Sequence, residues 1–146
     1  MTETTSAVDT TANARTVETL LYALQDEDYD AAGSVLADNV EWQNVGIPAI
    51  NGRRRVMKIF RSGQGRMAFE VKIHRIAAEG NAVLTERTDA LIFGPLRLHF
   101  WVCGAFEVHG GKITLWRDYF DFFDFLVKAP LRGLAGMLVP SRRPTL

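Results

Sequence analysis

Three charged residues of this sequence have mainly apolar neighbours at a spacing of two residues. If residues 82–93 form a strand, Arg87 and Asp89 share one of its faces with Val83 and Leu91, since successive side chains alternate. In the same way, Asp118 shares a face with two aromatic side chains, those of residues 116 and 120. Charges among apolar groups are costly unless they are paired, and such groups gather at functional sites. Two carboxyl groups bridged by a guanidinium could supply one acid and one base.

Whether these charges meet depends on the connections between the strands. Two-residue turns at both 94–95 and 110–111 would leave the two aspartates on opposite faces of an antiparallel sheet. A three-residue connection at 94–96 would bring all three charged residues onto one face. A β-bulge would have the same effect, because one extra residue also reverses the alternation. An active site therefore requires one odd-length connection or one bulge.

Periodicity predicts the elements that carry these residues. Apolar residues at helical spacing and capping residues predict three helices before residue 63, and an alternation of period two predicts long strands after it. The first expected helix contains Val17 to Leu24, the second begins after Asp28, and the third spans 53–62. The expected strands cover 40–45, 67–78, 82–93, 96–109 and 112–123. An apolar helical segment at 125–139, interrupted by Pro130, is expected to pack as a lid or against the sheet. Helices followed by antiparallel strands indicate an α+β fold.

Composition narrows the class of protein. The chain has 146 residues and no net charge, so we expect one domain at 13–146 after a flexible tail at 1–12, and no affinity for nucleic acid. The basic stretch 53–66 is expected to be a solvated helix face. The start of the chain lacks the pattern of a signal peptide, and no run of about 18 apolar residues could span a membrane. We therefore expect a cytoplasmic protein.

The charged segments resemble those of a known enzyme family. Residues 84–89 (LTERTD) and 115–120 (LWRDYF) resemble the two catalytic segments of the limonene-1,2-epoxide hydrolase family, and residues 41–44 (EWQN) fall where that family carries a Tyr-x-Asn motif. The resemblance extends from about Val17 to Phe123. It implies a curved six-stranded mixed sheet with three to four helices packed over it, enclosing a deep apolar pocket (the cystatin-like or nuclear-transport-factor-2-like fold). It also implies a homodimer that needs no metal or organic cofactor.

The resemblance assigns roles to individual residues. Asp118 would be the base that activates water, Asp89 the acid that protonates the epoxide oxygen, and Arg87 the group that orients both carboxyls. Asn44 would hold the water. Trp42 replaces the tyrosine of the family motif, and its indole N–H can donate a hydrogen bond but cannot accept one. No Gly-x-Ser-x-Gly sequence is present, which excludes an epoxide hydrolase of the α/β-hydrolase type.

The flanking side chains predict the kind of substrate. Large apolar residues near the charges are expected to line the pocket: Leu91, Phe93, Trp101, Trp116, Phe120 and the small residue Cys103. Such walls favour a lipophilic terpenoid, fatty or sterol epoxide, with a vicinal diol as the product. Two other functions remain open on the same fold: a ketosteroid-isomerase-like enzyme or cyclase, and a non-catalytic carrier of sterols or lipids. A carrier has no need for a buried acid–base pair, and a ketone isomerase has little use for Arg87.

Overall fold

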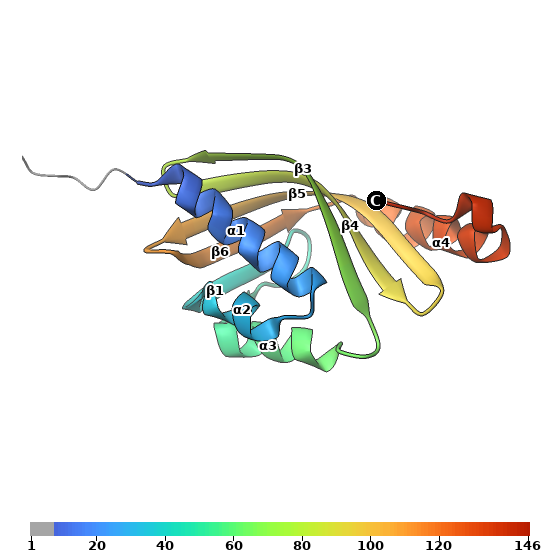
Figure 1. The fold of residues 1–146 in the computed structure, drawn as a ribbon, viewed down its shortest axis with the longest axis horizontal. Helices are drawn as coiled ribbons and strands as arrows, with labels where there is room; N and C mark the ends of the chain where they lie inside the picture. The colour runs from blue at the N-terminus through green and yellow to red at the C-terminus, as the bar shows by residue number, and fades with distance from the viewer. Residues whose placement is uncertain (1–7) are drawn as a thin grey trace, which may run out of the picture.

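A curved six-stranded sheet with strand order β2-β1-β6-β5-β4-β3 forms the centre of the protein (Figure 1). The structure is a computed structural model and describes residues 8–146. Its elements are α1 (Thr10–Gln25), α2 (Tyr29–Ser34), β1 (Leu36–Asn44), β2 (Ile50–Asn51), α3 (Arg53–Ser62), β3 (Ala68–Glu79), β4 (Ala82–Phe93), β5 (Leu96–His109), β6 (Lys112–Tyr119), a π-helical turn (Asp124–Lys128), α4 (Ala129–Leu138) and a short 3₁₀ turn (Pro140–Arg142). Neighbouring strands are antiparallel except β1 and β6, which run parallel. The expected α+β fold with a mixed sheet is confirmed.

The first helix begins earlier than the sequence pattern indicated. Asp9 caps α1 because its carboxylate accepts a hydrogen bond from the backbone N–H of Ala12 at 3.0 Å. The part of the expected tail from residue 10 to residue 12 is therefore helical, and its first seven residues lie outside the described part of the chain. The second helix starts after Asp28 as predicted, with the Asp28 carboxylate accepting from the N–H of Ala31.

The three N-terminal helices pack on one face of the sheet and form the core with it (Figure 1). Helix α1 contributes the predicted stripe that includes Val17 and Leu24, and α3 contributes Val56. The partner residues from the strands alternate, as a half-buried sheet requires. They include Val71, Val83, Phe106, Val108, Ile113 and Trp116.

The C-terminal segment packs against the sheet at the start of β5. Pro130 lies in the first turn of α4, directly after the π-helical turn. Gly133 allows close contact, since a Cβ there would lie 2.6 Å from the carbonyl oxygen of Arg97. Arg132 donates to the carbonyl oxygen of His99 at 2.7 Å and forms an ion pair with Asp124 at 2.9 Å. These contacts make the segment a packing helix.

Within residues 8–146, no helix is both long and apolar enough to cross a bilayer. In the same range, no group of three or more His, Cys, Asp and Glu side chains is arranged to hold a metal ion.

Candidate active site

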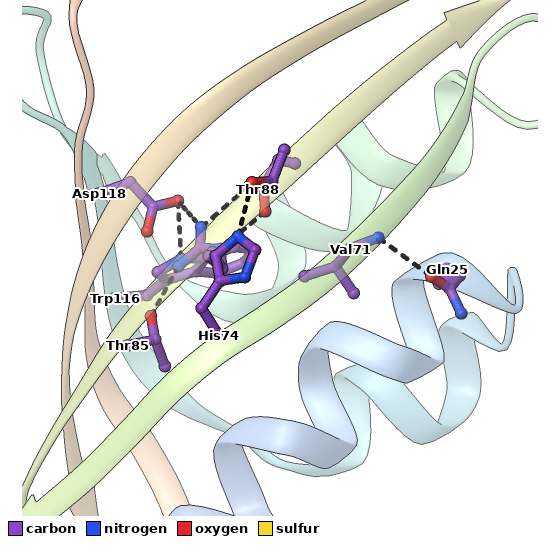
Figure 2. Close-up of polar contacts among 9 residues, drawn as sticks. Gln25, Val71, His74, Thr85, Thr88, Trp116 and Asp118 are labelled. Carbon is purple, nitrogen blue, oxygen red and sulfur yellow. Dashed lines mark hydrogen bonds and ion pairs between the residues drawn. The ribbon is translucent and has the colours of Figure 1, made fainter. Parts of the chain in front are cut away.

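Arg87 forms the centre of a buried polar cluster on the helix-covered face of β4. Its Nε donates to Asp89 Oδ1 at 2.9 Å and its Nη2 to Asp89 Oδ2 at 3.1 Å. The same Nη2 lies 2.8 Å from Asp118 Oδ2 on β6, and Nη1 donates to Thr85 Oγ1 at 3.1 Å (Figure 2). The side chain of Arg87 is fully buried, and those of Asp89 and Asp118 are nearly so. The predicted Asp–Arg–Asp arrangement is present.

A β-bulge brings Asp118 onto the same face as Arg87 and Asp89. The connection at 94–95 is a two-residue turn, with Phe93 opposite Leu96, so the three-residue alternative is wrong. In the β5–β6 hairpin, Ile113 pairs with Val108 but Leu115 pairs with Glu107, so one residue of β6 is left over. This extra residue reverses the alternation and places Asp118 opposite Gly104.

Gly104 provides the space that the guanidinium occupies. It lies opposite Thr85 on β4 and opposite Asp118 on β6. A Cβ at this position would overlap Arg87 Nη1 and would come within 2.7 Å of Thr85 Oγ1. Neither Gly104 nor Thr85 is among the site residues predicted from the sequence. Thr85 could have been found, because it precedes Arg87 by two residues and therefore shares its face.

For both carboxyls, burial raises the pKa and the ion pair with Arg87 lowers it. Burial raises the pKa of Asp89 to about 6, although Arg87 acts to lower it. Burial likewise raises the pKa of Asp118, against the charge of Arg87 and against hydrogen bonds from Arg87 and Trp116. Burial alone would lower the pKa of Arg87, but the charges of Asp118 and Asp89 raise it above its ordinary value. One permanent cation therefore lies between two carboxyls, an arrangement that favours one shared proton.

The two oxygens of Asp118 have different surroundings. Oδ2 receives the Arg87 guanidinium at 2.8 Å and the indole Nε1–H of Trp116 at 3.0 Å (Figure 2). Oδ1 is buried and has no hydrogen-bond partner among the described residues. An unpaired carboxylate oxygen in an apolar setting is a strong acceptor for an added O–H group.

Strand β1 places Asn44 and Trp42 beside this cluster. It runs parallel to β6, so that Asn44 is next to Asp118 and Trp42 is next to Trp116. The Trp42 ring stacks on Trp116 with centroids 5.2 Å apart, and also contacts Phe60 at 4.9 Å. Its buried Nε1 has no hydrogen-bond partner in the described part of the chain.

An apolar cavity of about 330 Å³ opens onto Asp89, Asp118, Asn44 and Trp42. It confirms the expected apolar pocket, and three of the predicted wall residues line it: Leu91, Trp116 and Phe120. Other residues of the cavity wall were not predicted from the sequence. These include Tyr29, Ile59, Phe60, Met67, Phe69, Val102, Phe122 and Phe125.

Three predicted wall residues do not line this cavity. Trp101 and Cys103 are exposed on the opposite face of β5, Trp101 at 69%, because the two-residue turn pairs Asp89 with Phe100 rather than with Trp101. The inward residues of β5 are therefore Phe100 and Val102. Phe93 is the last residue of β4, too far along the strand, and it is 42% exposed.

The chain is similar to known epoxide hydrolases over most of its length. The family model of the limonene-1,2-epoxide hydrolase catalytic domain matches residues 11–132. Epoxide hydrolase EphG of Mycobacterium tuberculosis (strain ATCC 25618 / H37Rv) is 58% identical over 130 residues, which cover 89% of this chain and 87% of EphG. The solved structure of an M. tuberculosis epoxide hydrolase described as LEH-like superimposes with a TM-score of 0.91 at 57% identity, covering 94% of this chain and 98% of that one.

More distant structures share the fold alone. One is a putative polyketide cyclase from Xanthomonas campestris pv. campestris, with a TM-score of 0.73 at 16% identity, covering 82% of this chain and 98% of that one. The family match and the identity to EphG, by contrast, extend over most of the chain. The chain therefore belongs to the limonene-1,2-epoxide hydrolase family and is an enzyme of the epoxide hydrolase class.

Proposed function

We propose that the protein adds water to a lipophilic epoxide in one step and releases a vicinal diol. Asp118 takes a proton from the attacking water while Asp89 gives its proton to the epoxide oxygen. An alkoxide is a poor leaving group and water is a weak nucleophile, so an acid and a base acting together lower the barrier most. Each positioned group typically contributes a factor of about 10² to 10⁴ in rate.

The unpartnered oxygen of Asp118 is the observation that carries this proposal. Both oxygens of Asp89 accept hydrogen bonds from Arg87, and Oδ2 of Asp118 is occupied by Arg87 and Trp116. Asp118 Oδ1 is the carboxylate oxygen of the cluster that has no partner within residues 8–146. A water molecule in the adjoining cavity would find its acceptor there.

The proton balance of the reaction closes within the cluster. The new bond joins the water oxygen to an epoxide carbon, and the C–O bond of the ring breaks. Afterwards Asp118 carries a proton and Asp89 is ionised, so the pair still holds one proton beside Arg87. Transfer of that proton back to Asp89 restores the enzyme. Arg87 remains protonated throughout, since its pKa is raised above its ordinary value.

Asn44 and Trp42 are the proposed holders of the water. Asn44 lies next to Asp118 across the parallel pair of strands and lines the cavity, so its side chain is suited to orient a water bound to Asp118. Trp42 can contribute one donated hydrogen bond, because an indole N–H cannot accept one. Its buried Nε1, which has no partner in the described structure, supports this role.

The substrate class follows from the walls of the cavity. They are mainly aromatic and aliphatic, with Glu27, Asn44 and the two aspartates as the few strongly polar side chains. Binding would therefore rely on apolar burial and on shape. Terpenoid, fatty and sterol epoxides are the classes that fit this description.

A single-turnover reaction in ¹⁸O-labelled water tests the mechanism. With enzyme in excess over a lipophilic epoxide, direct attack by water places the label in the diol during the first turnover. A first turnover that leaves the diol unlabelled and places the label in an aspartate would demonstrate a covalent ester and overturn the one-step mechanism.

Substitutions in the cluster test the assigned roles. Asp118→Asn and Asp89→Asn should each lower kcat by at least about 10²-fold while retaining the fold. Arg87→Lys should also be severely impaired, because an ammonium group cannot replace the planar fork that holds two carboxylates. Near wild-type turnover by Asp89→Asn would mean that another group protonates the epoxide oxygen.

We further propose that the protein forms a homodimer through the face of the sheet opposite the cavity. Leu84, Trp101 and Tyr119 are exposed on this face, at 57%, 69% and 46%, and lie around Cys103. Exposed apolar patches of this kind commonly mark interfaces. Light scattering should give a dimer mass for the wild type and a monomer mass for Leu84→Asp; a wild-type monomer would refute the proposal.

A further inference from the structure

The guanidinium of Arg87 contacts both carboxyls and does not by itself make Asp118 the base. Its Nη2 contacts both, at 3.1 Å to Asp89 Oδ2 and 2.8 Å to Asp118 Oδ2, and its Nε adds a hydrogen bond to Asp89. A shared cation stabilises the ionised form of either acid. Arg87 therefore explains why the pair holds a single proton. Its two hydrogen bonds to Asp89, against one contact with Asp118, do not explain why Asp118 becomes the base.

The indole of Trp116 donates a hydrogen bond to only one of the two carboxyls, that of Asp118. It is buried on β6, two residues before Asp118, and strand alternation places both side chains on the same face. Its Nε1–H donates to Asp118 Oδ2 at 3.0 Å (Figure 2). An indole N–H is a donor only, so it favours a carboxylate over a protonated carboxyl oxygen. No indole N–H donates to Asp89 among the hydrogen bonds of the described residues.

The Trp116 ring is held in place by stacking on several sides. Its centroid lies 5.2 Å from that of Trp42, 5.7 Å from that of Phe60 and 6.1 Å from that of Phe106. Interplanar angles of 29°, 13° and 20° show that these rings are roughly parallel. The position of the N–H is therefore fixed before any substrate binds, which is the condition for electrostatic preorganisation.

We infer that Trp116 is the positioning residue that makes Asp118, rather than Asp89, the base. Its N–H holds Oδ2, which leaves Oδ1 for the attacking water, and it stabilises the ionised form of this carboxyl alone. The inference rests on the acid–base mechanism proposed above. Trp116 acts through Asp118, and its other contribution is to the cavity wall.

Removing the N–H while retaining the ring shape tests the inference. Nonsense suppression can place 3-benzothienylalanine at position 116. This residue has sulfur in place of the indole N–H, in a ring of nearly the same size. Trp116→Phe also removes the N–H and needs only a codon change, but its ring is smaller. We expect the acidic limb of kcat/KM against pH to move upward by about one unit, the size of one lost hydrogen bond to an ionised group. Activity below that limb should fall about tenfold, and activity on the plateau much less.

Trp101 supplies the matched control. It is exposed on the opposite face of the sheet, and the same benzothienyl replacement there should leave the pH profile unchanged. A purely structural role for Trp116 would lower kcat/KM by the same factor at every pH. That result, with the acidic limb in its original place, would overturn the inference.

A carboxyl titration separates this inference from the proposed reaction. The side-chain ¹³C signal of Asp118, assigned by its loss in Asp118→Asn, should titrate at higher pH in the benzothienyl variant than in the wild type. An unchanged titration would overturn the role of Trp116 even if the enzyme hydrolyses epoxides. Absence of turnover by the wild type would refute the proposed function, and the titration would still decide the role of Trp116.

Discussion

Arg87 is among the largest side chains that the described fold buries completely. A buried guanidinium is stable only when its charge and its donors are matched, and here two carboxyl groups and the hydroxyl of Thr85 match them. Such a cluster is weak evidence for stability, because desolvation offsets most of the attraction between the charges. It is better evidence for a site in which a proton must be held at a chosen atom.

The raised pKa of Asp89 predicts how stability depends on pH. Its pKa is about 6 in the folded protein and 3.8 in the unfolded chain, so between these values the folded state keeps a proton that the unfolded state has released. Raising the pH through this window therefore favours unfolding. The ionisation of Asp89 should lower the free energy of unfolding by roughly 3 kcal/mol. Below pH 3.8 and above pH 6 its contribution should be flat.

Urea denaturation at a series of pH values provides the measurement. Asp89→Asn serves as the reference, because an amide of similar shape does not titrate. The fall in the free energy of unfolding between pH 4 and pH 6 should be shallower in this variant. Parallel curves for the two proteins would show that Asp89 is already ionised in the folded state near pH 4.

At the scale of the elements, the β-bulge in β6 and the glycine opposite Asp118 determine where the charged side chains of the site lie. The bulge at Thr114 moves Asp118 to the inner face, and Gly104 leaves room there for Arg87. Bulges frequently occur beside active sites because they redirect a side chain without ending the strand. The parallel pairing of β1 with β6 then adds Asn44 to the same place.

Gly104→Ala should impair the enzyme because a methyl group would displace the guanidinium. The new Cβ would overlap Arg87 Nη1 and would lie 2.7 Å from Thr85 Oγ1 and 2.8 Å from Phe106. We expect kcat/KM to fall by about 10²-fold, as for a displacement of about 1 Å at a catalytic group, and stability to fall by about 1–3 kcal/mol. Steady-state kinetics and thermal unfolding measure the two effects.

The neighbouring residue gives the control for this substitution. Cys103→Ala changes an exposed side chain on the opposite face of the same strand and should retain wild-type kcat/KM. If Gly104→Ala also retained wild-type kcat/KM, the position of Arg87 would not depend on the space at Gly104.

At the scale of the whole molecule, helices and sheet enclose a cavity whose walls come from most of the chain. Tyr29 belongs to α2, Phe60 to α3, Leu91 to β4 and Phe125 to the π-helical turn. Because few polar groups face this space, affinity should increase with the apolar area that a ligand buries. The polar groups near Asp118 would then fix only the orientation of the epoxide.

A series of straight-chain 1,2-epoxides measures this property. Each added methylene that the cavity buries is worth about 0.8 kcal/mol, so kcat/KM should rise about fourfold per carbon until the cavity is filled. Epoxybutane should therefore be a much poorer substrate than epoxydecane. A series in which kcat/KM is constant or declines with chain length would contradict the role of the cavity as the substrate pocket.

The sequence by itself determined the elements whose signals are local. The bounds of β4, β5 and α3 follow from alternation, helical spacing and the glycines of the turns, and the structure reproduces them. Arg87 and Asp89 share a face because a strand has a period of two, whatever surrounds it. The start of α1 at Thr10 was missed, although Asp9 is a common capping residue, because no apolar periodicity begins there.

Only the tertiary structure decided how these elements meet. The bulge at Thr114 has no local sequence signature; it arises where Ile113 and Trp116 are both buried in the core although they are an odd number of residues apart. That one residue determined that Asp118 faces Arg87, and the turn at 94–95 determined that Trp101 and Cys103 face outward. The pairing of β1 with β6 joins residues more than 70 positions apart, and its register depends on the packing of both strands against the helices.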